Sequence, residues 1–220
     1  MPVVYIVGDS TVEDNKAPFR GWGYCMPEFV AEGVTVRNHA LSGRSSKSFL
    51  DEGLFEPVRE NIAAGDLLLI QFGHNDEKPD EERRTEPDST FPEKLNIYID
   101  TALNVGALPV LMTPVSRRHY NEDGTMKFTH GAYPDAIRKL AAERGVPLID
   151  LKMLTRELYL QLGREETAKL FVQLKPGENP DFPDGHDDLT HYNETGARAV
   201  CGLIVKEMRQ DERLSKYLKA

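Results

Sequence analysis

Short apolar runs alternate with longer segments of helical periodicity along this chain, and this alternation limits the folds open to it. Each run is bounded by Gly, Pro, Asn or Asp, as is typical of strands that are buried on both faces. The expected strands cover residues 3–8, 34–39, 67–73, 108–114 and 146–151. The expected helices cover residues 26–31, 55–64, 91–105, 132–144, 154–171 and 195–209. The alternation predicts an α/β fold in which helices cover both faces of a parallel sheet.

Length and charge narrow the class of protein further. The 220 residues contain no linker-like segment, which predicts a single domain over residues 1–220. A net charge of −9 argues against nucleic acid or an anionic membrane surface as the main partner. The N-terminus lacks the features of an export signal, and no apolar run has the length of a membrane span, so we expect a cytoplasmic protein. The oligomeric state is not determined by the sequence.

The two cysteines give no sign of a disulfide. Cys25 and Cys201 are far apart in the chain, and each has apolar neighbours with helical spacing. We expect both to be reduced side chains that pack in the interior.

A polar tripeptide follows the first expected strand. Asp9, Ser10 and Thr11 come directly after Gly8, which places Ser10 at the carboxyl edge of the sheet, where ligands bind in folds of this class. The alternative is that Ser10 or Thr11 only caps a turn. Ser10 also lacks the G-x-S-x-G pattern, so an α/β-hydrolase is not expected.

A serine nucleophile needs a base and an orienting acid. Asp188 and His191 are three residues apart, just ahead of a segment with helical spacing, and we expect them on one side of a single turn. A carboxylate in that position would fix the tautomer of the imidazole, whose other nitrogen could then face a serine. Alternatively, Asp188 caps the turn and His191 is an ordinary surface histidine.

Two further strand ends supply candidate oxyanion donors. Asn75 follows the third expected strand, and its amide could donate to a developing negative charge. Gly43 follows the second, and without a Cβ its backbone N–H can approach a ligand closely. Either residue could instead serve only a turn. The coincidence of a nucleophile, two donors and an acid–base pair at one sheet edge favours a catalytic interpretation.

Four sequence blocks carry a family resemblance. They are GDSTV at 8–12, NHALSGRSSKSF at 38–49, QFGHND at 71–76 and DDLTH at 187–191. With these blocks in this order, the chain resembles the SGNH (GDSL-type) hydrolase superfamily, and within it the rhamnogalacturonan acetylesterase-like carbohydrate esterases of family 12. GDST in place of Gly-Asp-Ser-Leu, and the histidine before Asn75, favour the acetylesterase branch over the lipolytic branches.

The resemblance implies a fold and an activity. The fold would be a three-layer α/β/α sandwich with a flavodoxin-like, five-stranded parallel sheet. Ser10 would be the nucleophile, Asp188 and His191 would complete the triad, and the Ser10 backbone N–H, Gly43 and Asn75 would form the oxyanion hole. The activity would be hydrolysis of acetyl esters on a carbohydrate, rhamnogalacturonan or another pectin, without metal or organic cofactor.

Residues for substrate binding are less sharply defined. The lone tryptophan, Trp22, is a candidate sugar-facing platform, with a buried core position as the alternative. Asp9, Arg44 and His74 are further candidate substrate-binding residues. An acidic polysaccharide would have to bind through local cations. Those considered are Arg44, Lys47, Arg83, Arg84, Arg117 and Arg118.

Other functions stay open at this stage. The substrate could instead be acetylated xylan or a small sugar acetate. A metal-dependent phosphoesterase would need a cluster of Asp, His and Asn ligands. The candidate ligands are Asp9, His74, Asn75, Asp76, His186, Asp187 and His191. A carbohydrate-binding protein without activity is a third hypothesis, because fold alone does not fix function.

Overall fold

The predicted parallel sheet is present, with its five strands in the order β2-β1-β3-β4-β5 in a computed structural model that describes residues 1–219. The strands are β1 Val3–Gly8, β2 Thr35–Asn38, β3 Leu67–Gln71, β4 Leu108–Met112 and β5 Leu148–Ile149. Every neighbouring pair in this sheet is parallel. This is the strand order of a flavodoxin-like sheet. From β1 the chain adds β2 on one side and β3, β4 and β5 on the other, and ligands bind in such folds at the carboxyl ends of β1 and β3, where the order changes.

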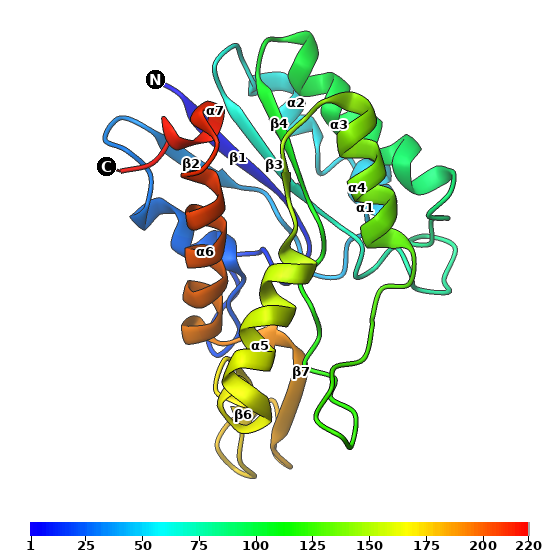
Figure 1. Ribbon diagram of the computed structural model, residues 1–220, viewed down its shortest axis with the longest axis vertical. Coiled ribbons are helices and arrows are strands. Elements are labelled where there is room, and N and C mark those ends of the chain that lie inside the picture. The colour runs from blue at the N-terminus through cyan, green and yellow to red at the C-terminus, as the bar shows by residue number, and fades with distance from the viewer. Residues whose placement is uncertain (220) are drawn as a thin grey trace.

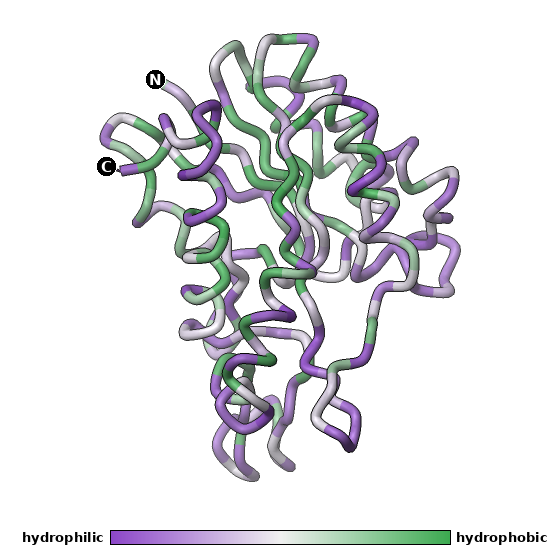
Figure 2. The backbone as a smooth tube through the Cα atoms, in the orientation of Figure 1, coloured by the Kyte–Doolittle hydropathy of each residue, from purple (hydrophilic) through white to green (hydrophobic). Residues whose placement is uncertain are grey.

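Alternate residues of the strands enter two separate cores. Val4 and Ile6 of β1 pack into one apolar cluster, whereas Tyr5 and Val7 pack into the other. All four side chains are buried. In Figure 2 the apolar colour is concentrated on the central strands and the polar colour on the loops around them. The prediction that the runs are buried on both faces is therefore confirmed for β1, β3 and β4. It is wrong for the edge strand β2, where Thr35 and Arg37 are exposed because no further strand pairs beside them.

Helices form a layer on each side of the sheet, which confirms the three-layer architecture (Figure 1). One layer contains α1 Ser46–Asp51, α2 Glu56–Asn61, α3 Thr90–Asn104 and α4 Tyr133–Arg144. The other contains the 3-10 helix η1 Trp22–Glu28, α5 Leu151–Ala168 and α6 Glu194–Met208, and the short α7 Glu212–Ser215 follows. Cys25 and Cys201 are free and buried in this second layer, as expected.

Several element boundaries differ from those expected. The helix expected at residues 26–31 is η1, at 22–28, and Pro27 inside it has no N–H for an α-helical ladder. Strand β5 is only two residues long. Asp150, directly after it, is the N-cap of α5, and its side chain accepts a hydrogen bond from the Met153 N–H. α5 is interrupted at Gly163, whose φ of +75° is left-handed.

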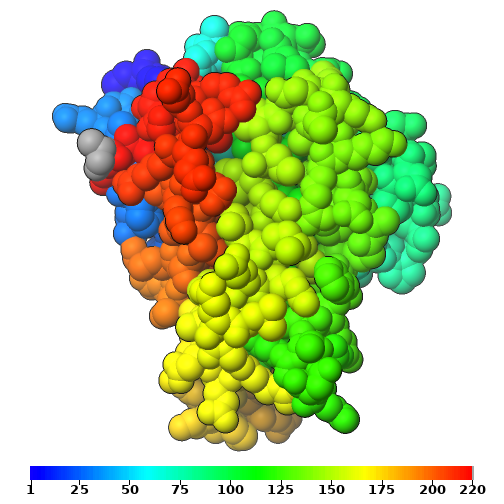
Figure 3. Space-filling view, viewed as in Figure 1, coloured from blue at the N-terminus to red at the C-terminus, as the bar shows by residue number. Residues whose placement is uncertain are grey.

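An antiparallel hairpin lies outside the main sheet and was not expected. It joins β6 Phe171–Leu174 to β7 His186–Tyr192, with an irregularity in the pairing between Phe171 and Gln173. In Figure 1 the hairpin lies beside α5, at the end of the molecule away from the chain termini. Figure 3 shows that this end narrows into a lobe in which α5 is flanked by the loop that follows β4. The hairpin carries two of the predicted site residues, Asp188 and His191.

Within residues 1–219, the helices are all too short or too polar to cross a membrane.

Candidate active site

Ser10, His191 and Asp188 form a continuous hydrogen-bonded chain. Ser10 Oγ lies 3.0 Å from His191 Nε2, and His191 Nδ1 lies 2.9 Å from Asp188 Oδ2. An ionised carboxylate only accepts hydrogen bonds, so Nδ1 carries the imidazole proton and Nε2 accepts from the Ser10 hydroxyl. The structure thus brings together residues that are 181 positions apart in the sequence.

Ser10 is held in place by a buried chain of polar contacts beneath it. At Gly8 a Cβ would lie 2.8 Å from the Gln71 carbonyl oxygen, so the end of β1 has no room for a side chain. Trp22 Nε1 donates to Gln71 Oε1 at 2.8 Å, and Gln71 Nε2 donates to Thr11 Oγ1 at 2.7 Å. Thr11 donates to Asp9 Oδ1 from both its backbone N–H and its hydroxyl. The turn that presents Ser10 is therefore tied to β3 and to η1.

The other half of the site depends on a local turn at Asp188. Its Oδ1 accepts from the backbone N–H groups of Thr190 and His191, both at 2.7 Å. This turn brings the Asp188 carboxylate to the His191 ring although both residues belong to strand β7. The expected contact at a spacing of three is present, and the turn lies just ahead of α6 as expected, although within strand β7, which was not predicted.

Asp188 also binds a second histidine. His186 Nε2 lies 2.9 Å from Asp188 Oδ2, the same oxygen that His191 contacts. Partial burial raises the pKa of the Asp188 carboxyl, but hydrogen bonds from His191 and His186 offset it, and the pKa lies well below its usual range. Asp188 is thus ionised in the pH range in which an imidazole base works.

Gly43 and Asn75 lie at the same cavity as Ser10. Asn75 Nδ2 donates to the Arg44 carbonyl at 3.0 Å, which fixes the amide against the turn that contains Gly43. One amide hydrogen is used in this contact, and the second is available to a ligand. Gly43 has a φ of +78°, a conformation that favours glycine. The arrangement can offer backbone and side-chain donors to one negatively charged oxygen.

The cavity above these residues has a volume of about 750 Å³. It is lined by Ser10, Glu13, Asp14, Asn15, Lys16, Phe19, Ser42, Gly43, Asn75, Lys78, Arg83 and His191. Glu13 accepts from the Ser42 backbone N–H at 2.7 Å, which joins the loops that follow β1 and β2. Most of these groups are polar, as expected for a site that binds a hydrophilic molecule.

Of the two interpretations of Trp22, the sugar-facing platform is wrong and the buried core position is confirmed. The Trp22 ring is fully buried, and its N–H is used by Gln71. The aromatic side chain at the cavity is instead Phe19, which is partly buried and lies edge-on to His191 with ring centroids 5.9 Å apart. Phe19 also contacts Phe182 and so links the N-terminal loop to the β6–β7 connection.

The other three candidate substrate-binding residues do not line the cavity either. Asp9 is fully buried, and burial raises the pKa of its carboxyl to about 6. His74 is buried with its Nδ1 2.8 Å from His130 Nε2, and burial lowers its pKa well below the usual value. The Arg44 side chain pairs with Glu52 instead, and only its carbonyl serves the site.

The residues considered as metal ligands are held by different partners. Asp76 accepts from Ser46 and Thr85, and burial raises the pKa of its carboxyl to about 7. Asp187 pairs with Arg118, away from the cavity. Across residues 1–219, no group of three or more His, Cys, Asp or Glu side chains is arranged to hold a metal ion.

Two contributors to this region were not expected in these roles: His186 was considered only as a metal ligand, and Phe19 was not considered. The spacing of two histidines around Asp188, in the pattern H-x-D-x-x-H, is the signal that points to His186. Phe19 has no comparable signal, because its position depends on the path of the loop after β1.

Comparisons with known proteins identify the family and agree with the fold. The GDSL-like Lipase/Acylhydrolase family matches residues 6–199. Rhamnogalacturonan acetylesterase RhgT of Bacillus subtilis is 47% identical over 210 residues, which cover 94% of this chain and 89% of that protein. The crystal structure of protein YxiM from Bacillus subtilis superposes with a TM-score of 0.81 at 28% identity, over 95% of this chain and 56% of that one. The acetyl xylan esterase AlAXEase shares the fold, with a TM-score of 0.66 at 18% identity over 93% of this chain and 98% of that one.

Proposed function

The chain belongs to the GDSL-like lipase/acylhydrolase family. We propose that it is a carbohydrate acetylesterase that deacetylates rhamnogalacturonan or a similar pectic saccharide. The observation that carries the proposal is the contact of 3.0 Å between Ser10 Oγ and His191 Nε2, with Asp188 behind the imidazole. The name of the relative at 47% identity supports the choice of substrate.

In the proposed reaction, Ser10 attacks the carbonyl carbon of an acetyl group while His191 takes the hydroxyl proton. The negative charge that develops on the carbonyl oxygen is stabilised by the backbone N–H groups of Ser10 and Gly43 and by Asn75 Nδ2. His191 then donates the proton to the departing sugar oxygen. Water, activated by the same imidazole, releases acetate from Ser10.

Asp188 keeps the imidazole in the productive tautomer throughout this cycle. Its carboxylate accepts from Nδ1 of His191, which directs the free nitrogen toward Ser10. When His191 becomes an imidazolium, the negative charge of Asp188 stabilises it.

The test of the serine mechanism is the hydrolysis of p-nitrophenyl acetate by the wild type and by the Ser10→Ala variant. We expect the variant to lose activity by about 10⁴-fold or more. Ser89→Ala is the matched control, because Ser89 is exposed and its side chain makes no capping hydrogen bond. Equal rates for wild type and Ser10→Ala would overturn the proposal.

A metal-dependent hydrolase would behave differently in the same assay. We expect the wild-type rate to survive exhaustive chelation, because the proposed steps use only Ser10, His191, Asp188 and the oxyanion donors. Activity that disappears on chelation and returns with manganese or zinc would favour the metal mechanism.

The substrate is tested by acetate release from acetylated rhamnogalacturonan, acetylated xylan and small sugar acetates. We expect the pectic substrate to give the highest kcat/KM. A higher value for xylan would retain the esterase mechanism and replace the proposed substrate.

A further inference from the structure

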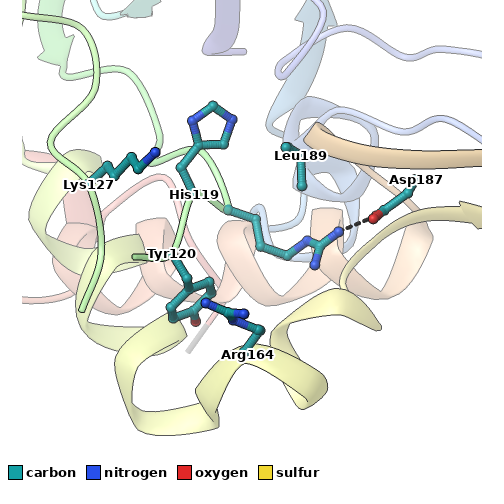
Figure 4. Close-up of a pocket in the computed structure, with 7 residues that line it drawn as sticks. His119, Tyr120, Lys127, Arg164, Asp187 and Leu189 are labelled. Atoms are coloured by element: carbon teal, nitrogen blue, oxygen red, sulfur yellow. Dashed lines mark hydrogen bonds and ion pairs between the residues drawn. The ribbon is translucent and has the colours of Figure 1, made fainter. Parts of the chain in front are cut away.

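A second cavity, of about 420 Å³, lies beside strand β7 and outside the catalytic cavity (Figure 4). We call it the cationic pocket, and it is lined mainly by Arg118, His119, Lys127, Arg164, Asp187 and Leu189. Its walls come from the loop after β4, from α5 and from β7. None of these six residues takes part in the proposed ester hydrolysis.

The pocket carries more positive than negative charge. Asp187 is its one acidic lining residue, and it pairs with Arg118, as the dashed line in Figure 4 shows. Within residues 1–219, Lys127 and Arg164 form no ion pair. Two positive charges are therefore left uncompensated on a chain whose net charge is −9. A local excess of this kind attracts an anion.

Arg118 is held rigidly at this pocket before any ligand arrives. Its residue is only 9% exposed, and its backbone N–H donates to the Leu189 carbonyl at 2.8 Å. The guanidinium carbon lies 5.7 Å from the centre of the Phe171 ring. The Arg118 Nε is buried and has no hydrogen-bond partner among the described residues. A guanidinium that is already ordered loses little entropy when it binds an anion.

Arg164 and Lys127 complete the binding surface. The Arg164 guanidinium lies 5.7 Å from the centre of the Tyr120 ring and donates to the Asn121 carbonyl at 2.6 Å. In Figure 4 Lys127 reaches toward His119 across the pocket from Arg164. Partial burial, followed by the charges of Arg117 and Lys127, lowers the pKa of His119, in agreement with a positive field in the pocket.

The cationic pocket adjoins the catalytic cavity along β7. Leu189 lines the former and His191 lines the latter, and the two residues are two positions apart on the same strand. At a rise of about 3.3 Å per residue, two strand positions span at most roughly 7 Å. A saccharide chain that is bound at Ser10 and follows β7 would therefore reach Leu189.

From these observations we propose that the cationic pocket binds the carboxylate of an acidic sugar in the same chain as the acetylated unit. This inference rests on the proposed function, because it assigns the pocket to the substrate of that reaction. Charged recognition beside the site would let an acidic enzyme retain an acidic polysaccharide. Charged recognition would also discriminate against neutral polysaccharides, which offer the cations of the pocket no partner.

The direct test is calorimetric titration with trigalacturonate, and with galactotriose as a neutral ligand of the same size. We expect wild type to bind trigalacturonate more tightly, with an affinity that falls as ionic strength rises. The double variant Lys127→Met/Arg164→Met should bind it at least about tenfold more weakly, because two charged donors are lost. Lys139→Met/Lys206→Met is the matched control, because it removes two exposed lysines elsewhere.

Unchanged affinity in the Lys127→Met/Arg164→Met variant would overturn the inference. Competition by inorganic phosphate would also overturn it if phosphate bound with the same affinity as trigalacturonate, since the pocket would then be a general anion site. Equal affinity of wild type for galactotriose and trigalacturonate would have the same meaning.

Kinetics separate this inference from the proposed function. The double variant should hydrolyse p-nitrophenyl acetate at the wild-type rate, because this small neutral ester does not extend to the pocket. Its KM for acetylated rhamnogalacturonan fragments should rise while kcat is unchanged. Wild type that fails on p-nitrophenyl acetate contradicts the proposed function. If wild type hydrolyses that ester normally and the double variant shows no change in KM for the fragments, only the proposed role of the cationic pocket is contradicted.

Discussion

Ser10, Gly43 and Asn75 follow three adjacent strands of the parallel sheet, whereas Asp188 and His191 lie on a two-stranded hairpin outside it. We call these the sheet side and the hairpin side of the site. The sheet side is fixed from below by buried polar groups, from Trp22 to Asp9. The hairpin side is fixed by hydrogen bonds within a few residues of Asp188 and by contacts of its aromatic neighbours. From outside the hairpin, Arg118 donates to the Leu189 and Asp188 carbonyls.

The two sides are therefore coupled to the rest of the fold to different degrees. Buried polar groups on the sheet side have fixed partners, so their loss leaves unsatisfied atoms in the interior and destabilises the protein. On the hairpin side, the His186 and His191 side chains are 31% and 37% exposed. Substitutions there should change activity more than stability.

The largest effect is expected for Asp188→Asn on the hairpin side. An amide cannot hold the negative charge that stabilises the imidazolium, and it can present a donor to Nδ1 in place of an acceptor. We expect kcat/KM for p-nitrophenyl acetate to fall by about 10⁴-fold. The melting temperature should also fall, because the ionised Asp188 carboxylate contributes stability. A loss of less than tenfold would contradict the role of Asp188.

Asn75→Ala is the corresponding change on the sheet side. Removal of one oxyanion donor should lower kcat by about 10²-fold or more, with little change in KM. The variant should also lose about 1 kcal/mol of unfolding free energy, because the hydrogen bond to the Arg44 carbonyl is lost. Asn61→Ala is the control, since Asn61 makes a similar side-chain contact to a carbonyl far from the site. An unchanged kcat would leave Asn75 with a structural role alone.

His186→Ala tests whether the second histidine positions Asp188. A hydrogen bond to a charged group contributes about 1.5 kcal/mol or more, so kcat/KM should fall roughly tenfold. With one donor fewer, the Asp188 carboxylate is held less firmly against His191, so the loss should appear in kcat rather than in KM. His186→Gln keeps a donor and should restore most of the rate. If the Ala and Gln variants have the same kcat, His186 does not act through Asp188.

The smallest effect on activity is expected for Asp76→Asn. This variant tests how the unfolding free energy depends on pH. Burial raises the pKa of Asp76 from 3.8 to about 7, so its contribution to stability is present below pH 3.8 and is lost as pH rises through about 7. The contribution of Asp188 to stability changes with pH in the opposite direction, since its lowered pKa gives stability that is lost as pH falls. Denaturant unfolding between pH 4 and 7 should therefore show a flatter pH dependence in Asp76→Asn, by roughly 1.4 kcal/mol per pH unit. An unchanged slope would show that Asp76 is ionised in the folded protein.

The sheet side was also the easier one to predict. A strand such as β3 is buried at every residue from Leu67 to Gln71, so its apolar run is continuous in the sequence and its end is clear. The parallel sheet and the position of Ser10 at its carboxyl edge follow from such runs, whereas the flavodoxin-like strand order was implied by the family resemblance.

The hairpin side could be predicted only in part. Strand β7 has the sequence HDDLTHY, which has few apolar residues, because much of the strand is only partly buried. No periodicity marks it as a strand, and the helical pattern beginning at residue 195 obscures its end. The contact between Asp188 and His191 was nevertheless expected, because it depends on local spacing rather than on the element.

The sequence held a signal that could have decided between the two interpretations of Trp22, a sugar platform and a core position. Aromatic rings suit both sugars and cores, and one tryptophan does not distinguish these uses. Gln71, a polar residue at the end of an otherwise apolar strand, needs a buried partner. Trp22 Nε1 is that partner, and the pair could have been proposed from this need.

The hydrogen bonds that connect Trp22 to Asp9 have a consequence for protein engineering. Attempts to broaden the acyl group that the enzyme accepts should leave this interior unchanged, because substitutions there would mostly yield misfolded variants. Lys16 and Lys78, on the rim of the catalytic cavity, have no such ties within the described chain and are better positions for directed evolution.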